Sequence, residues 1–200
     1  MKKILILVLF WLPFTVWANN TNNYTEQIVA YFDMSENLCS GKTTDAYYYR
    51  TVLQNNSDGS SLIQDFYVLS EQADPTDTLK LTDPYKVKTT SLKEFDSVPI
   101  EGTKTMWAAN GVKFSETNYL DGKPHGASFA WYPVNGEKWI ELNYVNGKKE
   151  GSYTSWYLNG QKEEEGQFLN GLSDGLWLSW YEDGKQKSTY SFKNGEVIKK

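Results

Sequence analysis

The chain has 200 residues, of which 25 are acidic and 20 are lysine or arginine, so its formal net charge is −5. This acidic balance excludes nucleic acid or an anionic membrane surface as the main binding target, because both repel a negatively charged protein. Cys39 is the only cysteine. An intramolecular disulfide is therefore excluded, and Cys39 is a packed side chain, an intermolecular link or a reactive thiol.

The first residues, MKKILILVLFWLPFTVWANN, have the layout of a secretory signal peptide. Two lysines form a positive start, residues 4–14 are an apolar run too short for a permanent span, and Val16 and Ala18 supply a small-residue cleavage pattern. We predict that residues 1–18 are removed between Ala18 and Asn19. The mature protein is then exported to the periplasm or cell envelope, or secreted, with no integral membrane segment. The alternative is an uncleaved anchor.

Residues 19–94 form a lead-in region with weaker signals. Residues 25–32 fit either a short helix or an edge strand. Residues 45–53 and 61–69 are rich in aromatic and β-branched residues, which predicts two strands joined as a hairpin. Phe66-Tyr67 is either an eroded copy of the aromatic-then-turn motif that repeats in residues 95–200 or unrelated to that motif. A hinge near residues 91–99 separates this region from the clear repeats, without creating two independent cores.

Residues 95–200 repeat with a period of 24 or 25. Four sequence features recur at the same positions in all four repeat units. The first is a tryptophan: Trp107, Trp131, Trp156, Trp180. The second is a glycine five residues earlier: Gly102, Gly126, Gly151, Gly175. The third is a first turn after each tryptophan: Asn110-Gly111, Asn135-Gly136, Asn159-Gly160, Asp183-Gly184. The fourth is an aromatic followed two residues later by a second turn: Tyr119, Tyr144, Phe168, Phe192.

Asn-Gly and Asp-Gly pairs favour type I′ turns, because both central residues of that turn need positive φ. We therefore expect such a turn at every pair, with Pro133 adding one residue to the second unit's turn. The segments between the turns suit strands. The predicted fold class is all-β: an elongated antiparallel meander of stacked β-hairpin repeats, with at least six strands within 102–192.

The pattern GxxxxWYxNGxK…YxNG resembles the variant MORN repeat of bacterial proteins of the YwqK antitoxin type. The resemblance covers about residues 95–200, is best in the last two units and is degenerate in the first, where Ala108 replaces the tyrosine. The choline-binding repeat is a rival whose period is shorter. The MORN resemblance implies a single-layered sheet of stacked hairpins that serves as a scaffold, binds a partner or neutralises a toxin, without catalytic chemistry.

The residues themselves also predict a protein that is not an enzyme and holds no metal or cofactor. His125 is the only histidine, and it occupies a turn position where other units carry an acidic residue. The run Glu163-Glu164-Glu165 is expected to place Glu163 and Glu165 on one face of a strand and Glu164 on the other. No nucleophile, carboxylate pair or metal cluster emerges from these residues.

Alternation along the strands separates two faces. The Trp face is the more apolar in two of the three clear units and is expected to pack inside. The Tyr face is mixed, as recognition surfaces often are, and supplies the candidate binding residues Tyr132, Tyr153, Tyr157, Trp177 and Tyr181. Alternatively, these aromatics only stabilise cross-strand pairs. The sequence thus predicts an exported, non-enzymatic scaffold that binds another protein; the alternatives are an antitoxin or immunity protein, or a binder of cell-wall glycan.

Overall fold

The computed structural model describes residues 27–40, 46–68, 79–88, 91–93 and 99–199. The predicted signal peptide and its cleavage site at Ala18 and Asn19 lie outside these residues. Within them there is no helix, and so none that could span a bilayer. The predicted all-β class is confirmed.

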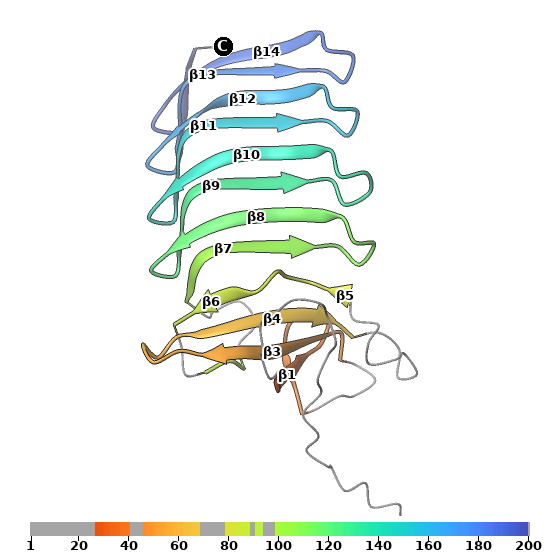
Figure 1. Cartoon of the computed structure of the whole chain (residues 1–200). Coiled ribbons are helices and arrows are strands. Elements are labelled where there is room, and N and C mark those ends of the chain that lie inside the picture. The colour runs from red at the N-terminus through yellow and green to blue at the C-terminus, as the bar shows by residue number, and fades with distance from the viewer. Residues whose placement is uncertain (1–26, 41–45, 69–78, 89–90, 94–98, 200) are drawn as a thin grey trace, which may run out of the picture.

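Strands β1 to β6 form the N-terminal part of the sheet, at the lower end of the stack in Figure 1. Residues 25–32 were ambiguous between helix and strand, and their described part is a strand. The predicted hairpin is confirmed, since β3 and β4 pair in register from Tyr48 and Tyr67 to Asn55 and Ser61. The bounds are β1 Gln27–Phe32, β2 Leu38–Cys39, β3 Tyr48–Asn55, β4 Ser61–Tyr67, β5 Leu79–Lys80 and β6 Tyr85–Val87.

Strands β7 to β15 form the repeating part, which rises as a stack of hairpins in Figure 1. Eight of them, β7 to β14, lie across 100–193, so the expected minimum of six strands is confirmed. The bounds are β7 Ile100–Trp107, β8 Lys113–Leu120, β9 Lys123–Trp131, β10 Lys138–Val145, β11 Lys148–Trp156, β12 Lys162–Leu169, β13 Leu172–Trp180, β14 Gln186–Lys193 and β15 Glu196–Lys199.

The described strands belong to one 15-stranded antiparallel sheet. From β7 onward its spatial order follows the chain, whereas the N-terminal order is β6-β4-β3-β1-β2, with β5 beside β4. Strand β6 pairs with β7 through Lys86 and Glu101, so the sheet is continuous past the predicted hinge, although residues 94–98 lie outside the described ones. The repeats therefore extend a sheet that begins in the lead-in region.

The hairpins close with two kinds of turn. At Asn170-Gly171, as at the other second turns, both residues have positive φ, which fits the predicted type I′ turn. At Asn159-Gly160 only Gly160 does, its N–H donates to the Tyr157 carbonyl, and the Tyr157 N–H donates to Gln161. This is a type I turn followed by a glycine bulge. The expectation of type I′ at every pair is wrong for the first turns, because their loops contain three residues or, after Pro133, four.

In the last three units, the glycine that precedes the tryptophan lies at a bulge inside a strand. In β11, Tyr153 opposes Leu142 and Lys149 opposes Tyr144, so the residues around Gly151 outnumber those on β10. Gly151 has φ 78°, a conformation that costs other residues energy. A bulge bends its strand, and the strands turn sharply near one end in Figure 1. The second-turn ends thereby fold over one face of the sheet.

The most deeply buried side chains lie in the N-terminal part, which the sequence marked only weakly. Phe32, Ile63 and Val87 are fully buried. Arg50 and Asp65 are fully buried too, and form an ion pair with 2.6 Å between Nε and Oδ1. Burial alone would lower the pKa of Arg50, but the hydrogen bond and charge of Asp65 outweigh it and raise that pKa. The described residues between 27 and 100 therefore supply most of the buried core beside which the repeats are stacked.

Candidate recognition face

We call the two sides of the repeat sheet the inner and the outer face. The inner face carries Tyr153, Ser155, Gly166, Phe168 and Trp177; the outer face carries the repeated tryptophans. Trp177 is 6% exposed, and its ring contacts Phe168 and Phe192 at 5.0 and 6.0 Å between centroids. Trp180 is only partly buried. The expectation that the Trp face packs inside is therefore wrong, because the bend folds the second-turn ends over the other face.

The predicted Tyr-face residues do not form one exposed surface. Trp177 is buried, and Tyr153 is half-buried against it at 5.4 Å between ring centroids. The hydroxyls of Tyr132 and Tyr157 donate to main-chain carbonyls of the next unit. Tyr181, which is 52% exposed, is the exception among the five. The structure thus uses four of these side chains in internal contacts.

The tyrosine contacts join consecutive units. The Tyr132 hydroxyl is 2.8 Å from the Trp156 carbonyl, and the Tyr157 hydroxyl is 2.9 Å from that of Trp180. In the N-terminal part, Tyr67 makes the same contact with Trp107 at 3.1 Å. Tyr67 therefore occupies the position of a repeat tyrosine, which supports the interpretation of Phe66-Tyr67 as an eroded copy.

The outer face carries a row in which tryptophan and lysine alternate from strand to strand. Trp156 lies opposite Lys162, and Trp107 opposite Lys113. Each ammonium lies over the ring of the tryptophan in the following unit, a favourable cation–π geometry. The distances from Nζ to the ring centroid are 3.7 Å for Lys80 and Trp107, 4.2 Å for Lys113 and Trp131, 5.2 Å for Lys138 and Trp156, and 5.4 Å for Lys162 and Trp180.

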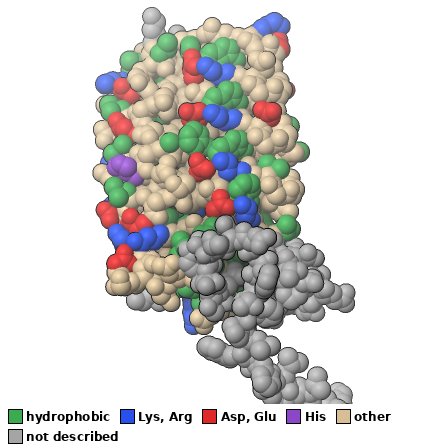
Figure 2. Space-filling view, in the orientation of Figure 1, with side chains coloured by type: hydrophobic (Ala, Val, Ile, Leu, Met, Phe, Trp, Pro, Cys, Tyr) green, Lys and Arg blue, Asp and Glu red, His purple; other side chains and the backbone are tan. Residues whose placement is uncertain are grey.

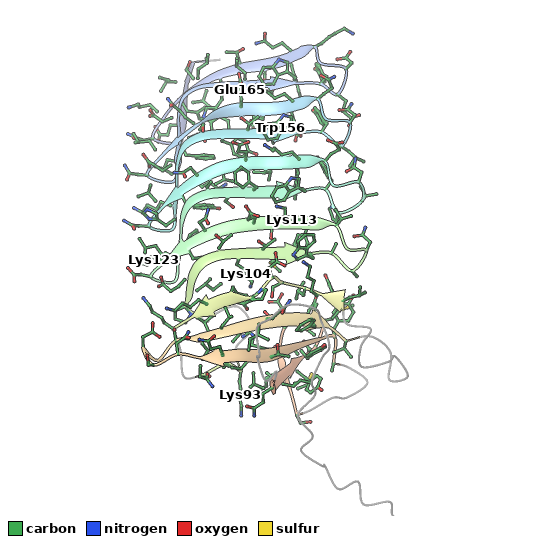
Figure 3. The ribbon with its side chains drawn as sticks, in the orientation of Figure 1. Lys93, Lys104, Lys113, Lys123, Trp156 and Glu165 are labelled. Atoms are coloured by element: carbon green, nitrogen blue, oxygen red, sulfur yellow. The ribbon has the colours of Figure 1, made fainter. Side chains whose placement is uncertain are left out.

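A glutamate three residues after Lys113, Lys138 and Lys162 completes the pattern. Lys113 Nζ lies 3.0 Å from Glu116 Oε2, Lys138 Nζ lies 2.8 Å from Glu141 Oε2, and Lys162 pairs with Glu165 in the same way. All six side chains keep about a third to a half of their surface exposed. Figure 2 shows the resulting column of hydrophobic, basic and acidic side chains along the stack, and Figure 3 labels three of its members. We call this column the Trp-Lys-Glu ladder.

The lysines and glutamates of the ladder were not among the predicted site residues, although Lys-x-x-Glu recurs in KFSE, KWIE and KEEE. In the fourth unit the pair becomes Gln186 and Thr189, with 2.6 Å between Nε2 and Oγ1. A neutral pair suits this position, because the described residues place no tryptophan beyond Trp180 for a cation to cover. Beside Trp180 the face is hollowed by about 260 Å³, lined by Gln161, Lys162, Trp180 and Gly184.

The other candidate groups are structural. His125 Nδ1 accepts the N–H of Asn146 at 3.4 Å, and Glu150 accepts that of Asn170 at 2.7 Å, so both hold second turns. The described residues contain no group of three or more potential metal ligands. Cys39 is partly buried and unpaired with another cysteine.

The acidic run departs from simple alternation. Glu165 belongs to the outer ladder, whereas Glu163 accepts from Ser155 Oγ on the inner face at 3.3 Å. The register shift between Ser155 and Trp156 interrupts the alternation that was expected to place Glu163 and Glu165 together. Burial and the charge of Glu163 raise the pKa of Glu164. The run is therefore divided between the two faces.

The comparisons with known proteins agree with this repeat geometry. No curated protein was found to match the chain. The family model of the MORN repeat variant matches residues 149–170 and 173–194. These ranges cover the hairpins that begin at β11 and β13, and strands β7 to β10 show the same pairing and turns. The last two units are thus similar to the MORN repeat variant, and strands β7 to β10 continue the same hairpin repeat.

Proposed function

We propose that the chain is an exported, non-enzymatic repeat scaffold that binds another protein through its outer face. The observation that carries this proposal is the Trp-Lys-Glu ladder. Each of the first three units offers a partly exposed indole, a cation and an anion on a sheet face, which are the groups that protein interfaces use as aromatic anchors and polar rims. Repeat proteins commonly bind partners through such periodic surfaces.

The ladder also suits recognition because it is held in place before a partner arrives. The indoles are fixed by the sheet below them and by the lysines of neighbouring strands. Preorganised side chains lose little conformational entropy on binding, so more of the contact energy appears as affinity. The ladder offers no nucleophile or proton shuttle, and the proposed role requires none.

The test is capture of a partner by the tagged mature protein from an envelope extract. We expect a protein that binds the wild type and is lost with the double variant Glu141→Lys and Glu165→Lys, which reverses two charges of the ladder. The double variant Glu182→Lys and Glu196→Lys is the matched control, because it makes the same two charge reversals away from the ladder. Equal capture by the ladder variant and the control would overturn the outer face as the binding site.

Two further measurements test the finer parts of the proposal. N-terminal sequencing of the natively expressed protein should return Asn19 or a residue close to it. Recovery of Met1 would contradict the proposed export. A captured partner with a toxic activity that is lost on binding would make the protein an antitoxin. A partner whose activity is unchanged would leave the scaffold role.

A further inference from the structure

The tryptophans of the ladder recur on every second strand. Neighbouring antiparallel strands lie about 4.8 Å apart, so successive tryptophans are about 9.6 Å apart along the stack. The row runs straight across the strands, because Trp156 opposes Lys162 and Trp180 opposes Gln186 at the same level of each hairpin. The tryptophans of the outer face are therefore evenly spaced along the stack.

Few polypeptide conformations share that period. A polyproline II helix has three residues per turn and rises about 3.1 Å per residue, so one of its sides repeats every ~9.3 Å. The mismatch with the tryptophans is only about 0.3 Å per unit. A β-strand repeats about every 6.8 Å, and an α-helix every ~5.4 Å. The repeat distances of a β-strand and an α-helix therefore do not match the spacing between successive tryptophans of the ladder.

We propose that the outer face binds a proline-rich segment of the partner protein in the polyproline II conformation, with one proline on each of Trp131, Trp156 and Trp180. This inference rests on the proposed function and names the chemistry of its partner. Aromatic side chains are the usual platforms for proline rings, and a segment that is already extended loses little entropy on docking. Its carbonyls have no internal partner, so the ammonium groups of Lys138 and Lys162, which lie between the three tryptophans, can donate to them.

The charges define a second requirement on the partner. Each of the three ladder lysines contacts Oε2 of its glutamate, at Glu116, Glu141 and Glu165. A basic side chain in every proline triplet would meet one carboxylate per unit, and a chain of net charge −5 attracts a basic segment as a whole. The favoured partner segment therefore repeats proline, any residue, and lysine or arginine. Its end can lie in the hollow beside Trp180, where Gln161 supplies a polar amide.

The experiment measures fluorescence anisotropy of a labelled peptide of about twelve residues, four turns of Pro-Ala-Lys, against the mature protein. We expect saturable binding that is at least about tenfold weaker for a peptide of the same composition in which the prolines are no longer three apart, because it cannot keep step. Trp156→Leu should weaken binding by about tenfold or more, as the loss of an aromatic anchor does. Trp139→Leu is the matched control, since Trp139 is exposed but contacts Tyr132 outside the ladder.

A charge swap keeps the test independent of folding, because a variant that gains a new peptide must be folded. The double variant Glu141→Lys and Glu165→Lys should lose the Pro-Ala-Lys peptide and gain Pro-Ala-Glu. Equal binding of the permuted peptide would overturn the periodic match. Binding of chitin oligosaccharides in place of the peptides, with the same dependence on Trp156, would overturn the polyproline partner in favour of a glycan.

The failure of this inference and of the proposed function are distinguishable. If the peptides do not bind but a captured protein still depends on Glu141 and Glu165, the polyproline inference fails and the protein-binding face stands. If capture ignores both glutamates and the peptides do not bind, both fail.

Discussion

The contact between Gly166 and Trp177 allows the packing of the inner face to be tested by adding a single methyl group at Gly166. A Cβ placed on Gly166 would lie 2.3 Å from Cδ2 and 2.4 Å from Cε2 of Trp177, well inside van der Waals distance. Gly166 does not have positive φ, so alanine is acceptable to the backbone and would, by itself, stabilise by about 0.4–1 kcal/mol. The effect of Gly166→Ala therefore reports the clash with the indole.

The magnitude follows from the burial of Trp177. Forcing an extra methyl into a packed site costs about 1–3 kcal/mol, and complete displacement of a buried tryptophan costs about 3–5 kcal/mol. Because Trp177 is 6% exposed and donates from Nε1 to the Gln167 carbonyl at 3.2 Å, it has little room to move. We expect Gly166→Ala to lower the free energy of unfolding by about 2–4 kcal/mol.

The assay is urea denaturation of four proteins: the wild type, Gly166→Ala, Trp177→Ala and the double variant. In the Trp177→Ala background the methyl has nothing to meet, so Gly166→Ala should be neutral or slightly stabilising there. The coupling between the two sites should then be about 2 kcal/mol or more, as for residues in direct contact. An equal loss in both backgrounds would refute the packing of the indole on Gly166 and, with it, the assignment of the inner face.

Three further predictions use other contacts. Tyr157→Phe should lower stability by about 0.5–1.5 kcal/mol in thermal melts, because it loses the hydrogen bond to the next unit, whereas Tyr181→Phe should have no effect. Glu164→Gln should raise the melting temperature at neutral pH, because the raised pKa of Glu164 means that protonation favours the folded state. The gain should vanish in acid, where the Glu164 carboxyl is protonated in both the folded and the unfolded state. A gain in melting temperature that persists in acid would contradict this prediction. Asp65→Ala should cost about 3–5 kcal/mol, because it leaves the buried Arg50 cation without its carboxylate. A fully stable variant would mean that water reaches this site.

The sequence by itself determined the strands and where they turn. Asn-Gly pairs, a glycine before each tryptophan and aromatic segments between turns are local signals that act within one hairpin. They predicted the meander, the extra residue at Pro133 and the absence of helix in the repeats, and the described residues confirm all three. The turn at Asn159-Gly160 was located correctly, but its type depends on loop length and strand register, which the dipeptide alone does not define.

Only the tertiary structure decided which face is covered. Alternation divides a strand into two sets of side chains but says nothing of which set another part of the chain will bury. Here the bulge at Gly151 and its equivalents folds the second-turn ends onto Trp177. The set that carries the repeated tryptophans, such as Trp156, therefore stays open and is paired with lysines. The buried pair of Arg50 and Asp65 was equally hidden, because two distant charges reveal their partnership only when the strands that carry them lie side by side.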